Sequence, residues 1–456
     1  MTLATTSLDQ TTPIHPLAEA ALPGWLAAQP AAVGAWVSAH RFTAKPETCL
    51  VLPNATGHIA AVLAGVEATP HLWSLAHLPA ALPAGAYRVE GDWSAETIAD
   101  AALGFTLAQY QFTRYKKSDR EPAVLALPES VDIRRVEATA DAINLVRDLI
   151  NTPANDMGPE QLSAAARAVA QRIGATFREI VGEALLKENY PAIHAVGRAA
   201  AQAPRLLELT HGDPSHPLVV LVGKGVTFDT GGLDIKPLSS MKLMKKDMGG
   251  AALVLGLAQL IVAMRLPIRL RVLIPAVENS IAGNAFRPQD VVSTRKGLTV
   301  EIGSTDAEGR VILADALAEG DSSKPAMMID VATLTGAARA ALGTELPALY
   351  SNRDAIAARL IQTGIACRDP LWHMPLWKGY DKYVSSTIAD VTNTPNYGFA
   401  GSITAALFLQ RFVSPETPWV HIDTYAWNAE NQPGRPVGGE ALTLRALFHY
   451  LRENFA

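Results

Sequence analysis

Residues 222–237, VGKGVTFDTGGLDIKP, decide how the chain is expected to fold. They follow an apolar run at residues 218–222 and hold two lysines, two acidic residues and four glycines within sixteen positions. An apolar run that leads into a glycine-rich, charged segment is typical of a buried strand that opens into a loop. We therefore expect a strand over residues 218–222, followed directly by a functional loop.

A second charged stretch, residues 303–313 (GSTDAEGRVIL), places Asp306, Glu308 and Arg310 at alternate positions. In an extended segment alternate side chains share a face, so these three are predicted to point into one cavity. Between the two stretches an acidic residue directly precedes an apolar helical run at residues 251–264. Acidic residues in short motifs, without nearby His or Cys, favour oxygen ligands for divalent cations. The predicted ligands are Asp229, Asp247, Asp306 and Glu308.

From residue 159 onward, helical and strand patterns alternate. Helices are expected at 161–173 and 251–264, and strands at 175–180, 192–196, 205–210, 219–222, 269–275 and 327–331. Alternation of this kind predicts a mostly parallel central sheet flanked by helices. Sites in such sheets gather at the carboxyl ends of the strands, and Lys224, Asp229 and Thr333 all follow predicted strands.

The first part of the chain predicts a smaller α/β domain. Residues 48–66 indicate two strands joined by a turn, 85–90 a further strand and 94–112 a helix, while residues 1–30 are expected to wrap a surface. A charged stretch at 114–121 with prolines after it indicates a linker, and 132–150 has helical spacing. We therefore expect an N-terminal domain over residues 1–130, with a structural or assembly role. A catalytic domain is expected over 131–456, opening with the connecting helix.

The composition is that of an ordinary globular protein. Of 456 residues, 49% are hydrophobic and 18% charged, and the net charge is -5, so neither disorder nor an obligatory nucleic-acid or membrane partner is indicated. The two cysteines, Cys49 and Cys367, lie far apart and are expected to be reduced. The first sixteen residues lack the pattern of a secretory signal, and the apolar run at 251–264 is too short for a bilayer. A cytoplasmic protein is expected.

Several function classes compete for these motifs. The VGKG segment suggests a phosphate-binding loop, but that motif needs glycine where Leu218 stands and Ser or Thr where Gly225 stands. No G-x-S-x-G occurs, which argues against one common class of serine hydrolase, and none of the eleven histidines forms an HExxH pair. A non-enzymatic scaffold or DNA-binding regulator remains as an alternative. The charge over residues 1–130 argues against DNA binding, since acidic residues outnumber basic ones there.

The segments VGKGVTFDTGG, KKDMGGAA and STDAEGRVILADAL resemble the signatures of the leucine aminopeptidase (cytosol aminopeptidase) family. The resemblance runs from about Asn144 to the C-terminus. Ser304 stands where the family usually has Asn, AVGRAA near Gly197 departs from the usual AVGQGS, and residues 424–426 (Thr-Tyr-Ala) replace the usual Ile-Ala-Gly after WVHID. The resemblance implies an aminopeptidase that prefers leucine and other apolar N-terminal residues. The departure at 424–426 puts that preference, but none of the proposed ligands, in question.

The resemblance also implies two divalent ions a few ångströms apart, Mn²⁺ or Zn²⁺, with Mg²⁺ compatible with oxygen ligands. Asp229 and Glu308 would serve both ions, Asp306 one, and Asp247 with the neutral amine of Lys224 the other. An ammonium group has no lone pair and so cannot bind a metal ion. From the residues alone Lys224 therefore indicates a phosphate or carboxylate binder. Adjacent cations and burial would have to depress its pKa. Two close metals suit hydrolysis, since they activate water and polarise a carbonyl group.

Further roles come from the resemblance alone. Lys236, otherwise an ordinary surface lysine, would donate to the developing oxyanion. Arg310 would hold a bicarbonate ion that acts as general base, whereas by itself it would suggest a salt bridge to Asp306 or Glu308. The substrate contacts would be Met244, Thr333, Leu334 and Gly336, although a methionine by itself is more typical of core packing. The resemblance further implies a homohexamer, a dimer of trimers, acting on peptides.

Overall fold

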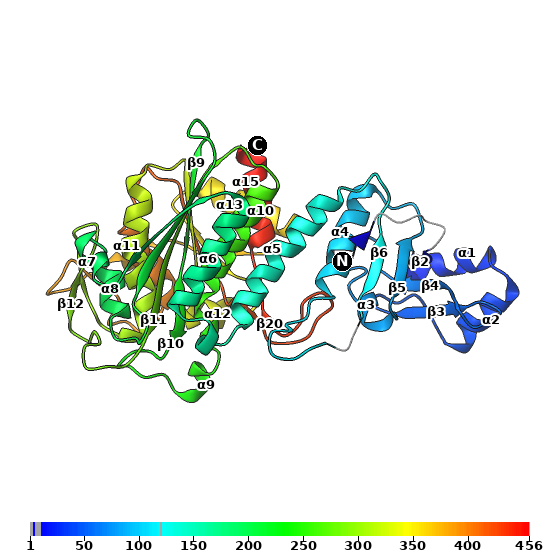
Figure 1. Cartoon of the computed structure of the whole chain (residues 1–456), viewed down its shortest axis with the longest axis horizontal. Helices are drawn as coiled ribbons and strands as arrows, with labels where there is room; N and C mark the ends of the chain where they lie inside the picture. The colour runs from blue at the N-terminus through cyan, green and yellow to red at the C-terminus, as the bar shows by residue number, and fades with distance from the viewer. Residues whose placement is uncertain (1–2, 5–10, 119–120, 456) are drawn as a thin grey trace. The chain divides into compact units, whose positions relative to one another are not determined.

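The computed structural model describes residues 3–4, 11–118 and 121–455. The chain divides into two compact units, Met1–Asn144 with Glu430–Val437, and Leu145–Ala429 with Gly438–Ala456. Each unit has its own β-sheet, which confirms the two-domain α/β fold (Figure 1). The expected connecting helix is present as α5 (Ile133–Asn151), and the units change over within it. The return of residues 430–437 to the first unit had no signal in the sequence.

A six-stranded sheet in the order β1-β6-β5-β2-β4-β3 forms the first unit. Only the pair β3–β4 is antiparallel. The expectation that residues 1–30 wrap a surface is wrong for residues 12–17, because β2 lies between β5 and β4 and buries Ile14 completely. Residues 1–2 and 5–10 of that stretch lie outside the described residues. The elements are β1 Leu3–Ala4, β2 Thr12–Leu17, α1 Leu22–Ala27, α2 Ala31–Ala39, β3 Cys49–Pro53, β4 Ile59–Gly65, α3 Leu78–Ala81, β5 Gly85–Val89, α4 Ala95–Leu107 and β6 Ala123–Ala126.

The second unit is built on a nine-stranded sheet in the order β16-β15-β18-β14-β9-β11-β8-β7, with β10 paired to β11. Strands β18, β14, β9 and β11 are mutually parallel, and antiparallel pairs lie on either side of them. The predicted mostly parallel centre is confirmed. The strands are β7 Thr176–Val181, β8 Arg205–His211, β9 Leu218–Gly223, β10 Gly225–Asp229, β11 Arg269–Asn279, β14 Met327–Ala332, β15 Ala348–Ser351, β16 Trp372–His373 and β18 Trp419–Asp423.

Helices cover both faces of this sheet (Figure 1). On one face lies α10 Gly249–Ala263, which packs against α6 Pro159–Ile173 and α15 Leu444–Phe455. On the other face lies α11 Glu308–Ser322, which packs against α8 Pro191–Gly197 and α14 Gly401–Gln410. The strand expected at 192–196 is wrong, because this segment is the helix α8. Pro191 occupies its first turn, where a proline is pre-organised for a helix, and Ile193 and Val196 are buried at helical spacing.

The remaining α-helices and strands complete the second unit. They are α7 Ala184–Lys187, α9 Leu238–Met241, α12 Gly336–Leu342, α13 Asp354–Ala366, the three-stranded sheet β12 Val291–Ser293, β13 Thr299–Glu301 and β17 Val391–Thr392, and the pair β19 Trp427–Asn428 and β20 Gly438–Gly439.

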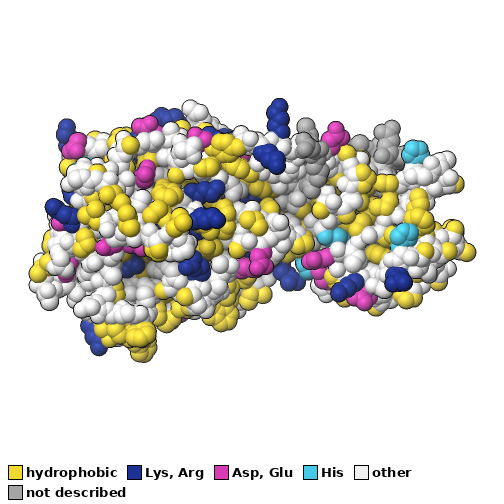
Figure 2. All heavy atoms as spheres, turned by 90° about the horizontal axis from the view of Figure 1, so that it is seen from below, with side chains coloured by type: hydrophobic (Ala, Val, Ile, Leu, Met, Phe, Trp, Pro, Cys, Tyr) yellow, Lys and Arg dark blue, Asp and Glu magenta, His cyan; other side chains and the backbone are white. Residues whose placement is uncertain are grey.

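The segment Met244–Ala263, which contains α10, is the one described helical segment long and apolar enough to cross a membrane. Within it, 89% of the most apolar window is buried inside the protein, as in the core helix of a folded domain. On the face drawn in Figure 2, basic and acidic side chains are interspersed among hydrophobic ones. Charges of both signs are therefore present among the coloured side chains of that face.

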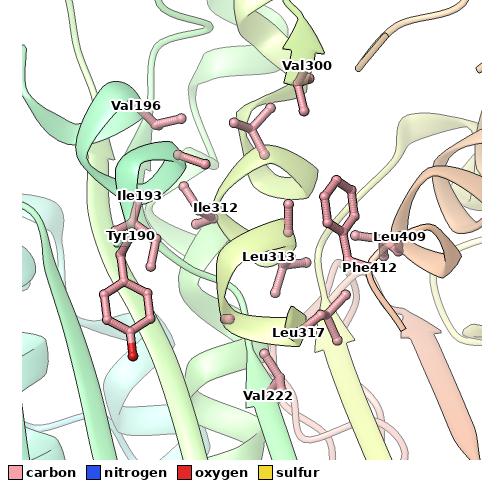
Figure 3. Packing of buried hydrophobic residues seen from close by; sticks show 14 of the residues in the cluster. Tyr190, Ile193, Val196, Val222, Val300, Ile312, Leu313, Leu317, Leu409 and Phe412 are labelled. Atoms are coloured by element: carbon pink, nitrogen blue, oxygen red, sulfur yellow. The ribbon is translucent and has the colours of Figure 1, made fainter. Parts of the chain in front are cut away.

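The main core of the second unit surrounds α11. Figure 3 shows Ile312 of α11 beside Tyr190 and Ile193, and Leu313 and Leu317 of the same helix near Phe412. These side chains are almost wholly buried. Because apolar side chains on both flanks hold α11, its first turn, which begins at Glu308, is fixed in place.

Candidate active site

The predicted site residues lie at the carboxyl edge of the central sheet. Lys224 sits between β9 and β10, Asp229 ends β10, Thr333 directly follows β14 and Asp423 ends β18. Carboxyl ends of neighbouring parallel strands meet at one edge, so these side chains converge. They line a cavity of about 280 Å³. Its lining contains all the predicted site residues except Arg310, namely Lys224, Asp229, Lys236, Met244, Asp247, Asp306, Glu308, Thr333, Leu334 and Gly336.

Asp306 and Glu308 reach the cavity by a route that the sequence did not predict. The expectation of an extended segment is wrong, since Asp306 lies in a one-turn 3-10 helix, Thr305–Ala307, and Glu308 is the first residue of α11. Ser304 caps this turn, because its hydroxyl accepts from the Asp306 N–H at 3.1 Å and donates to Asp234 at 2.8 Å. The serine at this departure from the family pattern therefore still supplies a polar cap.

Carboxylates and lysines alternate around the cavity. Ligand oxygens of Asp229, Asp306 and Glu308 all lie within 4.8 Å of one another. Lys224 Nζ lies 2.7 Å from Asp247 Oδ2 and 3.0 Å from Glu308 Oε1. The ammonium group of Lys236 is 2.8 Å from Asp229 Oδ2 and also pairs with Asp306. Four carboxylates against two ammonium groups leave the cluster with an excess of negative charge, as a cation site requires.

Burial and crowding perturb these groups. Burial raises the pKa of Asp247 to about 6, and burial together with the nearby Glu308 raises the pKa of Asp229 well above its ordinary value. Burial opposes the charge of Lys224, but Asp247 and Glu308 outweigh it and raise the pKa of Lys224. The charges of the protein alone therefore favour the ammonium form. A metal ligand needs the neutral amine, so adjacent cations would have to lower this pKa.

The residues fit a divalent cation. Oxygen Oε2 of Glu308, which is only 1% exposed, is buried and has no hydrogen-bond partner in the described part of the chain. Gly309 leaves room for the lysine, because a Cβ atom there would lie 2.6 Å from Lys224 Nζ. Carboxylate oxygens that converge around such an unsatisfied group are the donor set that hard or borderline divalent ions prefer.

Asn279, which the sequence did not single out, and Thr333, which was expected only as a substrate contact, orient the predicted ligands. Asn279, the last residue of β11, donates from Nδ2 to Asp229 Oδ1 at 2.8 Å and to the main-chain oxygen of Thr305 at 3.0 Å. The hydroxyl of Thr333 donates to Asp247 Oδ1 at 2.7 Å. Such contacts fix the orientation of a ligating carboxylate. The feature of the sequence that could have identified Asn279 is its position at the end of a strand.

Arg310 is buried and is not part of the cavity lining. It donates from Nη1 to the main-chain oxygen of Asn393 at 2.6 Å, and burial lowers its pKa to about 10. The alternative of a salt bridge is not observed, because the guanidinium forms no ion pair with Asp306, Glu308 or any other residue that the structure describes. A buried cation of this kind is suited to hold an anion.

The loop after β14 is held by a carboxylate that sequence reasoning also missed. Asp423 accepts hydrogen bonds from the main-chain N–H groups of Leu334 at 2.9 Å and Thr335 at 3.1 Å, and from the Thr335 hydroxyl. Thr335 in turn caps α12 by accepting from Ala338 N. The predicted substrate-contact residues Thr333 and Leu334 are thereby fixed at the cavity wall. Asp423 could have been identified in the sequence by its position at the end of a strand, as Asn279 could.

A pocket of converging carboxylates and lysines at the carboxyl edge of a parallel sheet defines the class of metal-dependent hydrolases. Residues 144–448 match the model of the cytosol aminopeptidase family, catalytic domain, and residues 12–128 match the M17 aminopeptidase, N-terminal domain. The chain belongs to the cytosol aminopeptidase family and is a metallo-aminopeptidase.

Individual relatives agree with this assignment. A probable cytosol aminopeptidase of Syntrophotalea carbinolica is 42% identical over 369 residues, which cover 77% of this chain and 74% of the relative. The crystal structure of the cytosol aminopeptidase from Coxiella burnetii is 48% identical, with a TM-score of 0.97 over 100% of this chain and 99% of that one. The bottromycin maturation enzyme BotP in complex with Mn is 33% identical, with a TM-score of 0.89 over 98% and 100% of the two chains.

Proposed function

We propose that this chain is a two-metal aminopeptidase that releases N-terminal residues, preferentially leucine and other apolar ones, from peptides. The observation that carries the proposal is the cluster of Asp229, Asp306 and Glu308, whose oxygens lie within 4.8 Å of one another. Two lysines lie beside it, the buried Lys224 and the partly buried Lys236. The presence of Mn in a BotP complex supports manganese as one suitable ion, with Zn²⁺ and Mg²⁺ as the alternatives.

The metals would be held by the residues described above. Asp229 and Glu308 would contact both ions, Asp306 one, and Asp247 with Lys224 the other. When bound, the ions would supply an activated water and polarise the scissile carbonyl group. Asp247 already has its other oxygen fixed by Thr333 at 2.7 Å, which supports a preset orientation.

The chain's own residues would orient the substrate and stabilise charge. The free amino group of the peptide would lie beside Asp247, which limits cleavage to the first peptide bond. Lys236, at the cavity wall, would donate to the oxygen that gains negative charge in the transition state. Arg310, a buried guanidinium without an ion-pair partner among the described residues, would hold bicarbonate as the base that removes a proton from water.

The preference for apolar N-terminal residues rests on one wall of the cavity. Apolar groups of Met244, Leu334, Ala338 and Leu346 line it, and methionine adapts to differently shaped side chains. Burying a leucine side chain against such a wall contributes about 1.5–3 kcal/mol. We further propose a cytoplasmic homohexamer, a dimer of trimers, in line with the family resemblance and with relatives named cytosol aminopeptidases.

Hydrolysis of leucine p-nitroanilide tests the proposal. The purified protein is assayed after removal of divalent ions by a chelator, and again after addition of Mn²⁺ or Zn²⁺. We expect activity to vanish on chelation and to return with metal, and the restoring ion identifies the preferred one. Hydrolysis at an unchanged rate in the chelated protein would refute the two-metal proposal.

A further inference from the structure

One buried lysine that lines the cavity is not a proposed metal ligand and forms no ion pair with the described residues. Lys246 is 5% exposed and lines the cavity one residue before Asp247. Its Nζ lies 4.5 Å from the ring centroid of Tyr425, and it forms no hydrogen bond or ion pair with any other residue in the described ranges. Burying an ammonium group without an ion-pair partner is costly, so a cavity lined by such a group is suited to an anionic ligand.

The nearby carboxylates are engaged elsewhere. Asp247 is paired with Lys224 and accepts from Thr333. The oxygens of Asp423 accept from the loop at Leu334 and Thr335. Asp247 and Asp423 oppose the burial that lowers the pKa of Lys246, but neither forms an ion pair with it in the described part of the chain. The ammonium group therefore still has room for an anionic partner in the cavity.

A second cation approaches the same aromatic ring. The guanidinium carbon of Arg339 lies 5.3 Å from the ring centroid of Tyr425, and this side chain too has no ion-pair partner in the parts of the chain that are described. Its Nη2 lies 3.9 Å from where a Cβ atom of Gly336 would stand, which places it at the substrate-contact loop. Tyr425, Lys246 and Arg339 thus form one cationic wall of the cavity, opposite in character to its apolar residues.

We infer that this wall, formed by Lys246, Tyr425 and Arg339, binds an acidic side chain on the substrate's N-terminal residue, so that peptides beginning with glutamate are a second substrate class. The inference rests on the proposed function. Glutamate and leucine have the same chain length to the γ carbon, so both fit beside Met244 and Leu334. The carboxylate of glutamate extends further and can accept charge-assisted hydrogen bonds from the ammonium group of Lys246.

The ring of Tyr425 gives the wall its shape. It stands at the departure from the usual Ile-Ala-Gly sequence, and a tyrosine there occupies volume that an alanine leaves open. The ring also gives the two cations a surface on which cation–π attraction offsets part of their burial cost. Lys246 and Tyr425 therefore act as one specificity element.

The test compares kcat/KM for glutamate and leucine p-nitroanilides in the metal-loaded protein. Lys246→Met keeps an unbranched side chain only one atom shorter and removes its charge. We expect it to lower kcat/KM for the glutamate substrate about 10–100-fold, the size of a charge-assisted hydrogen bond, and to leave that for leucine within about 3-fold. The matched control is Lys245→Met. Lys245 is the neighbouring lysine, lies 5.4 Å from the Trp427 ring, donates to the main-chain oxygen of Asn151 at 2.6 Å and is outside the cavity lining.

The possible outcomes separate this inference from the proposed function. Hydrolysis of leucine but not of glutamate by the wild-type protein, or an equal loss of both in Lys246→Met, overturns the inference alone. Hydrolysis of neither by the metal-loaded wild type overturns the proposed function. A second variant, Tyr425→Ala, covers a failure of Lys246→Met to fold. We expect it to lower the glutamate-to-leucine ratio several-fold, and an unchanged ratio overturns the inference.

Discussion

Replacing Lys236 by alanine tests whether this lysine stabilises the transition state. The side chain is largely buried, and its Nζ lies 2.8 Å from Asp229 at the wall of the cavity. A preorganised donor in such a site contributes about 2.7–4 kcal/mol to catalysis, so kcat should fall by roughly 10²–10³. Because the interaction strengthens only in the transition state, kcat and kcat/KM should fall together while KM changes little.

The assay is leucine p-nitroanilide hydrolysis at saturating metal, with the bound metal counted by elemental analysis. Both ions should remain, since Lys236 is not a proposed ligand. The matched control is Lys242→Ala, an exposed lysine six residues further on that does not line the cavity and should leave kcat unchanged. Unchanged turnover in Lys236→Ala with two metals bound would remove this lysine from the mechanism.

Three further substitutions test the remaining parts of the account. Asp306→Ala should abolish hydrolysis and reduce the metal count, and full activity would refute its assignment as a ligand. Gly309→Ala should improve helix propensity by about 1 kcal/mol, yet the new Cβ would lie 2.5 Å from Lys224 Cε. Loss of activity with the fold retained on circular dichroism is therefore expected, and wild-type turnover would contradict it. Oδ1 of Asp330 lies 2.6 Å from Nδ1 of the buried His421, and Asp330 raises the pKa of His421 against the effect of burial. Asp330→Asn should therefore lower the free energy of unfolding by on the order of 3–5 kcal/mol. The resulting decrease in Tm should be largest at pH 6 and shrink as pH rises through the raised pKa, because the protonated form carries the contribution; a decrease that grows with pH would refute the reasoning.

The parts of the fold that follow from local pattern could be predicted. The run at 218–222 became β9 because uninterrupted β-branched and apolar residues are buried on both faces of a parallel sheet. The acidic residues of the site were found because several charges beside glycines at strand ends are unusual. The residues alone predicted ligands for divalent cations, whereas the two-ion arrangement and the roles of Lys236 and Arg310 came from the family resemblance, and all of these are proposals.

The parts that depend on tertiary contacts could not be predicted. Residues 192–196 are apolar enough for a strand, but Pro191 and packing against α11 select a helix. Strand β2 was missed because only its position in the first sheet makes Ile14 buried. Asn279 and Asp423 act through hydrogen bonds to distant residues, among them Asp229, 50 positions from Asn279, and Leu334, 89 positions from Asp423, which no local pattern reveals.

The most direct test of the central claim is the number of divalent ions bound per chain, measured by elemental analysis after saturation with Mn²⁺ or Zn²⁺ and gel filtration. The account predicts two ions per chain in the wild-type protein and fewer in Asp306→Ala, with hydrolysis of leucine p-nitroanilide following the count. A fully active protein that binds no divalent ion, or an Asp306→Ala variant that keeps both ions, would contradict it.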